Sequence, residues 1–409
     1  MRTDGIRRAV RWRSWFGGPG FVVALATVLG AVLTYWTKPQ IFPDTQYYIL
    51  WTERLLGVTP RDAERMVTDY ITAVGSFDPY PTLYGWKLGV ELTRPRVLLP
   101  VLSVPFVGLF GPGGILVVPA IAYAAYSWAT YRVCRIHVAP WVAAVVTVLA
   151  VSPVQVRLWG LAALTDSLAL AAVALLLLAF PWRGPTGRGR LLWIAALAGA
   201  AGLARLMAPF TMAIGGALWL WSRRRHDAAT RRSWTWAFAA DVAGSLAATT
   251  VNSFAGGKPI SEYIFRQTGS DNWGDALRHV AGQVPHTLGV ELWNAVSDPT
   301  IVAILVLVVV GLLLDRSRLA GWLTLAAVVA TLTVVAVNPT PTHFRYELPA
   351  MPVLALAAAL GVSAWTGRRT GRAAGENETS DPDAGAERPG AADTGSAERD
   401  AVRVVPAGR

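Results

Sequence analysis

The sequence predicts an all-α polytopic membrane protein with about ten transmembrane helices and additional interfacial helices. Of the 409 residues, 53% are hydrophobic, 18 are Trp, and the mean hydropathy is +0.40. Apolar stretches recur along the chain, separated by short connections in which Arg residues cluster. Stretches of roughly 20 apolar residues are needed to cross the hydrocarbon core of a bilayer as a helix. This composition excludes an ordinary soluble enzyme.

The first apolar stretch, residues 21–37, follows a basic segment, as in a signal peptide. It is longer than a typical signal-peptide core and is followed by Lys-Pro-Gln instead of a small-residue cleavage site, so we expect a retained helix. Nine further stretches complete the predicted set. The ten predicted spans are residues 21–37, 115–131, 139–152, 167–181, 191–204, 207–221, 234–251, 300–314, 319–337 and 348–365.

The net charge of +11 reports topology and not nucleic-acid binding, because the basic residues are confined to particular connections. Six clusters hold 20 Lys and Arg residues against three acidic residues, counting Asp315 at the edge of the fifth cluster, as expected for cytoplasmic loops. We therefore predict a multi-pass protein of the cytoplasmic membrane with both termini in the cytoplasm. The clusters are residues 2–13, 132–135, 183–190, 223–232, 316–318 and 368–372.

The predicted outer connections contain most of the remaining ionisable residues. The two long ones are residues 38–96 and 252–299. We expect surface helices from Pro60 onward and again over 273–284, where apolar residues recur at helical spacing. Residues 97–110 are predicted to form an interfacial or half-inserted helix broken by Pro100, Pro105 and the following Gly-Pro-Gly-Gly.

The two ends of the chain lie outside the predicted transmembrane domain, residues 21–365. Residues 1–20 form a basic cytoplasmic segment, and residues 366–409 are rich in Ala, Gly and charge, which predicts disorder. The single cysteine excludes an intrachain disulfide. Asp241 lies within a predicted span, where an acid is costly, so we expect it to be paired structurally.

Polar residues at the outer helix ends are the candidates for chemistry, and each has a simpler interpretation. Asp44 and Asp166 each precede a predicted helix, where Asp commonly caps the first amides. Arginines at helix ends commonly snorkel to the interface, and Tyr residues form interfacial belts. The outward candidates are Asp44, Asp166, Arg94, Arg205, Arg345, Tyr47, Tyr48 and Tyr346.

The order of four outer motifs resembles the GT-C superfamily of polyprenyl-phosphate-sugar-dependent membrane glycosyltransferases, especially protein O-mannosyltransferases and lipid A aminoarabinose transferases. The motifs are Pro-Asp-Thr-Gln-Tyr-Tyr at 43–48, Thr-Arg-Pro-Arg at 93–96, Leu-Thr-Asp-Ser at 164–167 and Phe-Arg-Tyr-Glu-Leu-Pro at 344–349. The resemblance implies a GT-C-like fold and transfer of a sugar from a polyprenyl-phosphate donor to an envelope glycan, lipid or protein acceptor.

The resemblance also implies roles for the candidates. Asp44 matches the catalytic carboxylate, which takes the acceptor proton, and Asp166 matches a second acidic position that orients the acceptor or binds a divalent cation. Arg94 matches a basic position before Pro, and it is assigned with Arg205 and Arg345 to the donor phosphate. Tyr47, Tyr48 and Tyr346 are assigned to sugar or lipid contacts.

The sequence departs from the family pattern and leaves alternatives open. The first outer connection lacks a paired acidic doublet, and no large soluble domain follows the last helix. These departures leave the identity of the acceptor open, and the scattered His residues neither indicate nor exclude a divalent cation. A secondary transporter or lipid flippase is one alternative, although no internal repeat is found. A membrane scaffold without catalytic activity is the other.

Overall fold

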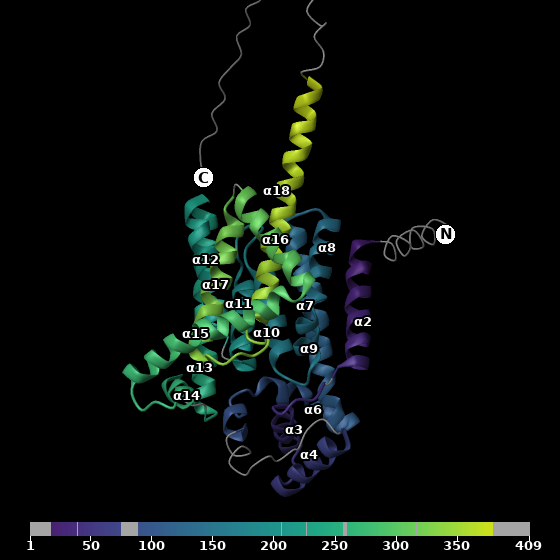
Figure 1. Ribbon diagram of the computed structural model, residues 1–409, viewed down its shortest axis with the longest axis vertical. Helices are drawn as coiled ribbons and strands as arrows, with labels where there is room; N and C mark the ends of the chain where they lie inside the picture. The colour runs from purple at the N-terminus through teal and green to yellow at the C-terminus, as the bar shows by residue number, and fades with distance from the viewer. Residues whose placement is uncertain are drawn as a thin grey trace, which may run out of the picture. The chain divides into compact units, whose positions relative to one another are not determined.

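A computed structural model describes residues 18–38, 40–74, 89–205, 207–225, 227–256, 260–315 and 317–378. Within these ranges every regular element is a helix (Figure 1). The chain divides into two compact units, Met1–Thr366 and Gly367–Arg409. The predicted basic segment falls largely, and the predicted disordered tail from 379 onward wholly, outside the described residues.

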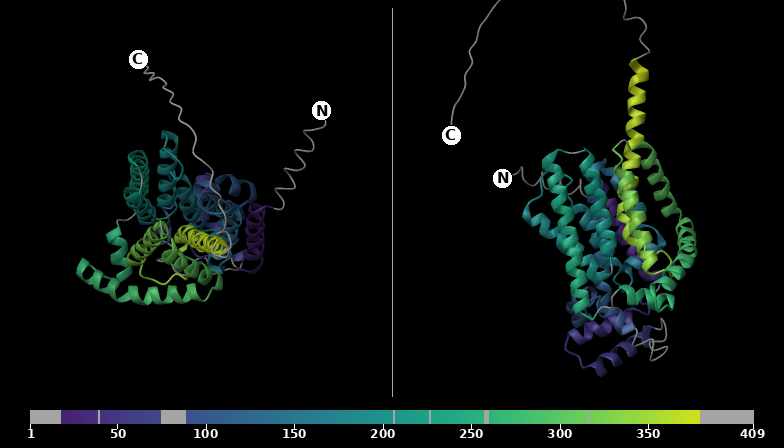
Figure 2. Two further views of the ribbon diagram at one scale, coloured as in Figure 1. Left: turned by 90° about the horizontal axis from the view of Figure 1, so that it is seen from above. Right: turned by 90° about the vertical axis from the view of Figure 1, so that its left-hand side faces the viewer.

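A bundle of helices forms the larger part of the first unit and contains its main hydrophobic core (Figures 1 and 2). A helix coincides with each of the ten apolar stretches predicted from the sequence. They are α2 (Pro19–Thr37), α7 (Val117–His137), α8 (Pro140–Val151), α10 (Asp166–Ala179), α11 (Arg188–Ala204), α12 (Ala208–Arg225), α13 (Ala228–Phe254), α16 (Pro299–Leu314), α17 (Leu319–Val337) and α18 (Met351–Glu378).

Fewer helices than ten are long and apolar enough to cross a membrane alone. Among the described residues four qualify, namely α2, α17, the stretch Pro112–His137 and the stretch Leu348–Thr366. The number rises to six if two bent pairs each count as one span: α8 with α9 (Val154–Leu161), bent by 72°, and α15 (Trp273–Val296) with α16, bent by 102°. The chain is thus compatible with a polytopic membrane protein. Helices such as α10 fall short of a full crossing by length.

A second, smaller hydrophobic core lies at one end of the bundle (Figure 1). It is built by α3 (Thr45–Leu55), α4 (Pro60–Val74), α6 (Leu98–Phe110) and the short 3₁₀ helix η1 (Pro112–Leu116), together with residues 162–164. The amphipathic pattern of α4 explains its place, since Ala63, Val67 and Ile71 are fully buried. Two cores therefore meet where the chain passes from α9 to α10.

Small residues allow the closest helix contacts in the bundle. A Cβ at Gly244 of α13 would come within 2.0 Å of the carbonyl oxygen of Ala195 on α11. Such close backbone approach is typical of helix pairs in membranes. By contrast, α2 lies at the edge of the bundle (Figures 1 and 2), and its apolar side chains Leu25, Leu29 and Leu33 are exposed.

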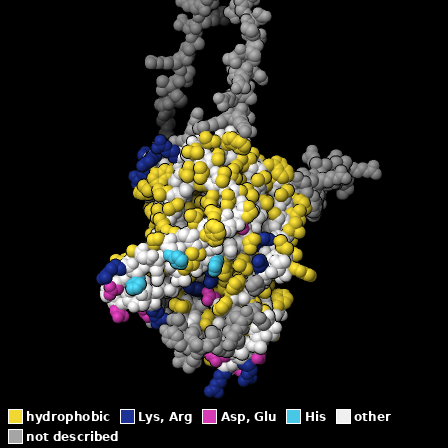
Figure 3. Space-filling view, in the orientation of Figure 1, with side chains coloured by type: hydrophobic (Ala, Val, Ile, Leu, Met, Phe, Trp, Pro, Cys, Tyr) yellow, Lys and Arg dark blue, Asp and Glu magenta, His cyan; other side chains and the backbone are white. Residues whose placement is uncertain are grey.

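The surface agrees with a membrane environment for the bundle. Hydrophobic side chains cover most of the visible face over the bundle, whereas charged side chains gather at the α3 and α4 end, over α14 (Ile260–Thr268) and α15, and at the opposite end (Figure 3). Such a broad apolar surface is exposed to water in few soluble monomers.

Several local expectations differ from the structure. The helix α6 continues through Pro100 and Pro105 and ends only before Gly111, whose φ of 68° stops it. Pro100 falls in the first turn, where its missing N–H costs nothing. The helix α18 runs on to Glu378, beyond the predicted end at 365. The expected surface helix at 273–284 is the first half of the longer α15.

The expectation that Asp241 is paired is wrong within the described residues. Its side chain on α13 is fully buried, and neither carboxyl oxygen has a hydrogen-bond partner there. The hydroxyl groups of Thr211 and Ser245 bond to each other at 3.0 Å, and that of Thr211 also lies near the Asp241 carboxyl. The acid packs against Gly215, where a Cβ would lie 2.2 Å from its Oδ2.

Candidate active site

Two loops distant in sequence are joined by hydrogen bonds, and this brings two acids together. The loop before α3 and the loop before α10 meet at Ala163, whose N–H donates to the carbonyl of Gln40 at 3.0 Å. The hydroxyl of Thr45 donates to the carbonyl of Ala163 at 3.1 Å. Asp44 and Asp166 stand directly beside these contacts, so both carboxylates point to the junction of the two cores.

One guanidinium group bridges the two acids. Arg345 donates from Nη2 to Oδ2 of Asp44 at 3.1 Å, and from Nε to Oδ1 and Oδ2 of Asp166 at 3.2 and 3.1 Å. Arg345 also lies over the ring of Trp159 at 5.3 Å. The charged cluster thus joins the residues before α3, the start of α10 and the loop before α18.

Arg205, in the connection between α11 and α12, closes the cluster from the bundle side. Its Nη1 donates to Oδ1 of Asp166, and its guanidinium stacks 3.8 Å above the ring of Tyr346. The side chains of Arg205 and Asp166 are only 4% and 1% exposed. Removing one partner of such a buried pair typically costs about 3–5 kcal/mol, because the other charge is left uncompensated.

The helix-cap interpretation does not describe either acid. Asp227 and Asp298 do cap helices, accepting from Thr230 N and Thr300 N. Asp44 occupies the N-cap position of α3 but makes no side-chain capping bond. Asp166 is the first residue of α10, and its cap is Thr165. Both carboxylates are instead directed to arginines.

Arg96, and not Arg94, is the arginine of the 93–96 motif that reaches the cluster. Nη1 of Arg96 lies 3.9 Å from Oδ2 of Asp44 and donates to the hydroxyl of Tyr48 at 3.2 Å. Arg94 is exposed and lies against Gly256, outside the cluster. The physical reason is a turn in which Arg96 N donates to Thr93 O at 2.9 Å, so the two arginines face different ways.

The three tyrosines differ in their surroundings. Tyr48 is fully buried and reaches the cluster through Arg96. Tyr47 is buried and packs against Gly89, where a Cβ would approach its ring within 2.0 Å. Tyr346 is partly exposed beneath Arg205. The ring of Tyr346 stacks directly on an arginine of the cluster.

The loop that carries Arg345 is held in an unusual backbone conformation. His343 and Phe344 have φ values of 54° and 66°, a region that residues other than Gly seldom adopt. The carboxylate of Glu291 on α15 accepts the N–H groups of Thr342 and Phe344. The indole of Trp159 donates to the His343 carbonyl at 3.0 Å. These bonds compensate for the local strain.

Trp159 and Glu291 were not identified from the sequence. Glu291 carries one weak signal, as an acid within an apolar helical segment. The role of Trp159 depends on a loop far away in sequence, and no local pattern reveals it.

The electrostatics of the cluster favour an anionic ligand. Three guanidinium groups, those of Arg96, Arg205 and Arg345, face the two carboxylates, so these five groups together carry one net positive charge. The buried neighbour Glu347, whose pKa burial raises to about 7, offsets only part of that charge. Nη2 of Arg205 is buried and has no hydrogen-bond partner within the described part of the chain. An unused buried donor beside excess positive charge suits a phosphate oxygen.

Asp44 is the accessible acid of the pair. Its side chain is 35% exposed, compared with 1% for Asp166. Burial acts to raise the pKa of Asp44, but Arg345 and Arg96 outweigh it and hold that pKa below its ordinary value. The carboxylate of Asp44 is therefore ionised at neutral pH and open to a hydroxyl group.

The described residues contain no group of three or more His, Cys, Asp and Glu side chains arranged to hold a metal ion. Both oxygens of Asp166, the residue expected to orient the acceptor or bind a cation, contact arginines. In comparisons with family models, characterised proteins and solved structures, nothing matched the chain. The proposal for function therefore depends on the geometry and chemistry of the cluster.

Proposed function

We propose that the protein is a GT-C-like membrane glycosyltransferase that transfers a sugar from a polyprenyl-phosphate donor to a cell-envelope glycan, lipid or protein acceptor. The observation that carries the proposal is the pairing of an accessible, ionised carboxylate, Asp44, with arginines whose positive charge exceeds the negative charge present. Such a transfer needs a proton acceptor and a cationic site for the departing phosphate.

The reaction is a single displacement with inversion at C1 of the sugar. The acceptor oxygen bonds to C1 while its proton passes to a carboxylate oxygen of Asp44. The bond between C1 and the phosphate oxygen breaks, and the lipid phosphate leaves with the electron pair. Arg345 and Arg96 stabilise the phosphate before and after the bond breaks, and the free Nη2 donor of Arg205 supplies a further contact.

Donor binding also prepares the base in this mechanism. In the absence of ligand Arg345 is shared between Asp44 and Asp166. A phosphate competes for the same guanidinium groups, so their hold on Asp44 weakens and the pKa of that carboxyl rises. Asp44 therefore becomes a better proton acceptor only when the donor is bound. Asp166 keeps Arg205 and Arg345 oriented.

The membrane arrangement follows from the same proposal. The α3 and α4 end of the bundle faces the outer side of the cytoplasmic membrane, where lipid-linked sugars meet envelope acceptors. Both termini lie in the cytoplasm, and the ten predicted helices together make the crossings, with α11 and α12 reaching only part of the way. The basic clusters support this orientation.

The test is to incubate the purified protein with a panel of polyprenyl-phosphate sugars and to measure lipid-phosphate release. Asp44→Asn keeps the shape but cannot accept the proton, so we expect donor binding to persist and turnover to fall by about 10²–10⁴-fold. Arg345→Ala is expected to weaken both donor binding and turnover. Asp62→Asn, an exposed acid on α4, is the matched control.

Normal turnover by Asp44→Asn would remove the carboxylate from the mechanism. Movement of intact donor lipid between leaflets without phosphate release would favour the flippase alternative. If no donor gives either phosphate release or lipid movement, the result would favour a scaffold.

A further inference from the structure

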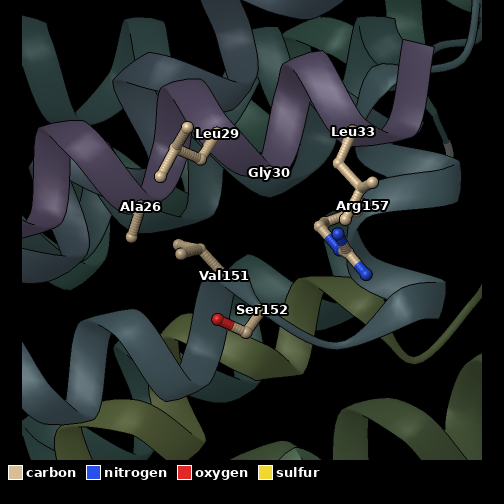
Figure 4. A pocket seen from close by; sticks show the side chains of 7 residues that line it. All are labelled: Ala26, Leu29, Gly30, Leu33, Val151, Ser152 and Arg157. Carbon is tan, nitrogen blue, oxygen red and sulfur yellow. The ribbon is translucent and has the colours of Figure 1, made fainter. Parts of the chain in front are cut away.

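A groove of about 290 Å³ lies between the edge helix α2 and the bend from α8 to α9 (Figure 4), and none of its lining residues belongs to the charged cluster. Ala26, Leu29, Gly30, Leu33 and Val151 give it apolar walls, and Ser152 and Arg157 supply its polar groups. This volume is near the lower limit of about 300–1,000 Å³ for small-molecule sites, so it suits a stretch of one hydrocarbon chain.

Arg157 gives the groove a charged end. Figure 4 shows its guanidinium beside Leu33. Within the described part of the chain no carboxylate forms an ion pair with it, and its buried Nε has no hydrogen-bond partner. Gly30 makes room for this side chain, because a Cβ there would lie 3.2 Å from Cδ of Arg157.

Arg157, on α9, lies alongside the candidate membrane span α2, and its depth beside that span makes the lack of a partner significant. The guanidinium lies beside Leu33 (Figure 4), about one turn before Thr37, the last residue of α2, and therefore roughly 6 Å from that end. A cation at this depth of a candidate membrane span needs a counter-charge or access to the interface. The protein supplies no counter-charge among the described residues.

We infer that this groove binds an anionic phospholipid of the surrounding bilayer, with one acyl chain along α2 and the phosphate on Arg157. Charge complementarity and the lipid-facing side of α2 favour this occupant, since Leu29 and Leu33 are exposed at the groove. The inference concerns lipid binding and does not depend on the proposed activity.

The helix α9 connects the groove to the cluster. Arg157 and Trp159 are two residues apart on it, and therefore about 200° apart around the helix axis. Arg157 contacts the groove, while Trp159 contacts Arg345 and the His343 carbonyl. A bound lipid thus fixes the face of α9 opposite to the one that supports the Arg345 loop.

The experiment is native mass spectrometry of the purified protein with phosphatidylglycerol, phosphatidylcholine or a polyprenyl phosphate. We expect preferential retention of phosphatidylglycerol. Arg157→Gln should weaken its binding by roughly tenfold or more, because a charged hydrogen bond is lost. Gly30→Leu should weaken binding of both phospholipids by filling the groove.

Two control variants leave the groove intact. Arg132→Gln removes an arginine that stacks on Trp128 of α7, and Ala24→Leu enlarges an exposed position of α2; neither should change retention. Equal retention of the two phospholipids, unchanged binding by Arg157→Gln, or preference for polyprenyl phosphate would overturn the inference.

A second measurement uses the unmodified protein, in case the variants do not fold. A photoreactive phosphatidylglycerol should crosslink to peptides containing residues 26–33 or 151–157. Crosslinks confined to other peptides would refute the assignment.

Discussion

Replacing Glu347 by Gln is expected to stabilise the protein at alkaline pH but not at acidic pH. Glu347 is buried beside the charged cluster, and its Oε2 has no hydrogen-bond partner among the described residues. Burial, and then the nearby charge of Glu291, raise the pKa of Glu347 to about 7. The ordinary value is 4.5.

The sign and size of the effect follow from this shift. Because the folded pKa is raised, the favourable contribution of the protonated carboxyl is fully present below pH 4.5 and is lost as the pH rises through 7. A difference of two to three pKa units corresponds to about 3 kcal/mol. Gln is neutral throughout, so the variant avoids this loss.

Thermal unfolding in detergent, followed by tryptophan fluorescence at pH 5, 6, 7 and 8, measures the effect. The melting temperature of Glu347→Gln minus that of the wild type should increase from pH 5 to pH 8. Asp62→Asn serves as an exposed-acid control, for which the difference should stay nearly constant. A constant difference for Glu347→Gln as well would refute the burial argument.

Three further outcomes are expected. Glu291→Gln replaces a carboxylate that accepts two backbone N–H groups, so hydrogen exchange in residues 338–347 should accelerate. Unchanged exchange would mean that this loop keeps its conformation without the Glu291 hydrogen bonds. Gly244→Ala should lower the melting temperature by overpacking α11 against α13, whereas Gly282→Ala, with open space around it, should raise it slightly through helix propensity; equal effects would contradict the close contact. Asp241→Ala should raise the melting temperature by removing a buried carboxyl without a partner, and a decrease would show that the acid has a stabilising contact.

The sequence predicted the positions of the helices better than it predicted which of them cross the membrane. Apolar stretches, prolines at helix starts and glycines after helix ends are local signals, and each predicted stretch contains a helix. Whether a helix of 14 residues such as α10 crosses a bilayer depends on its neighbours and tilt, which no local pattern records.

The sequence predicted those members of the candidate site whose place depends only on the side of the membrane at which a helix ends. Asp44 and Asp166 follow helix ends on one predicted side, and Arg345 now links them. The choice between Arg94 and Arg96 was not predictable, because both flank the same proline. Only the turn at Thr93 and the hydroxyl of Tyr48 direct Arg96 inward.

The place where the two hydrophobic cores meet has a consequence for how the protein tolerates change. Asp44 and Arg96 are attached to the smaller core, while Arg205 and Arg345 belong to the bundle. The charged cluster is complete only when the cores are docked in one register. A change such as Ile71→Ala, deep in the smaller core and outside the charged cluster, would then separate Asp44 and Arg96 from Arg205 and Arg345 while every helix remains folded. Loss of function without loss of helical structure would be the mark of such variants.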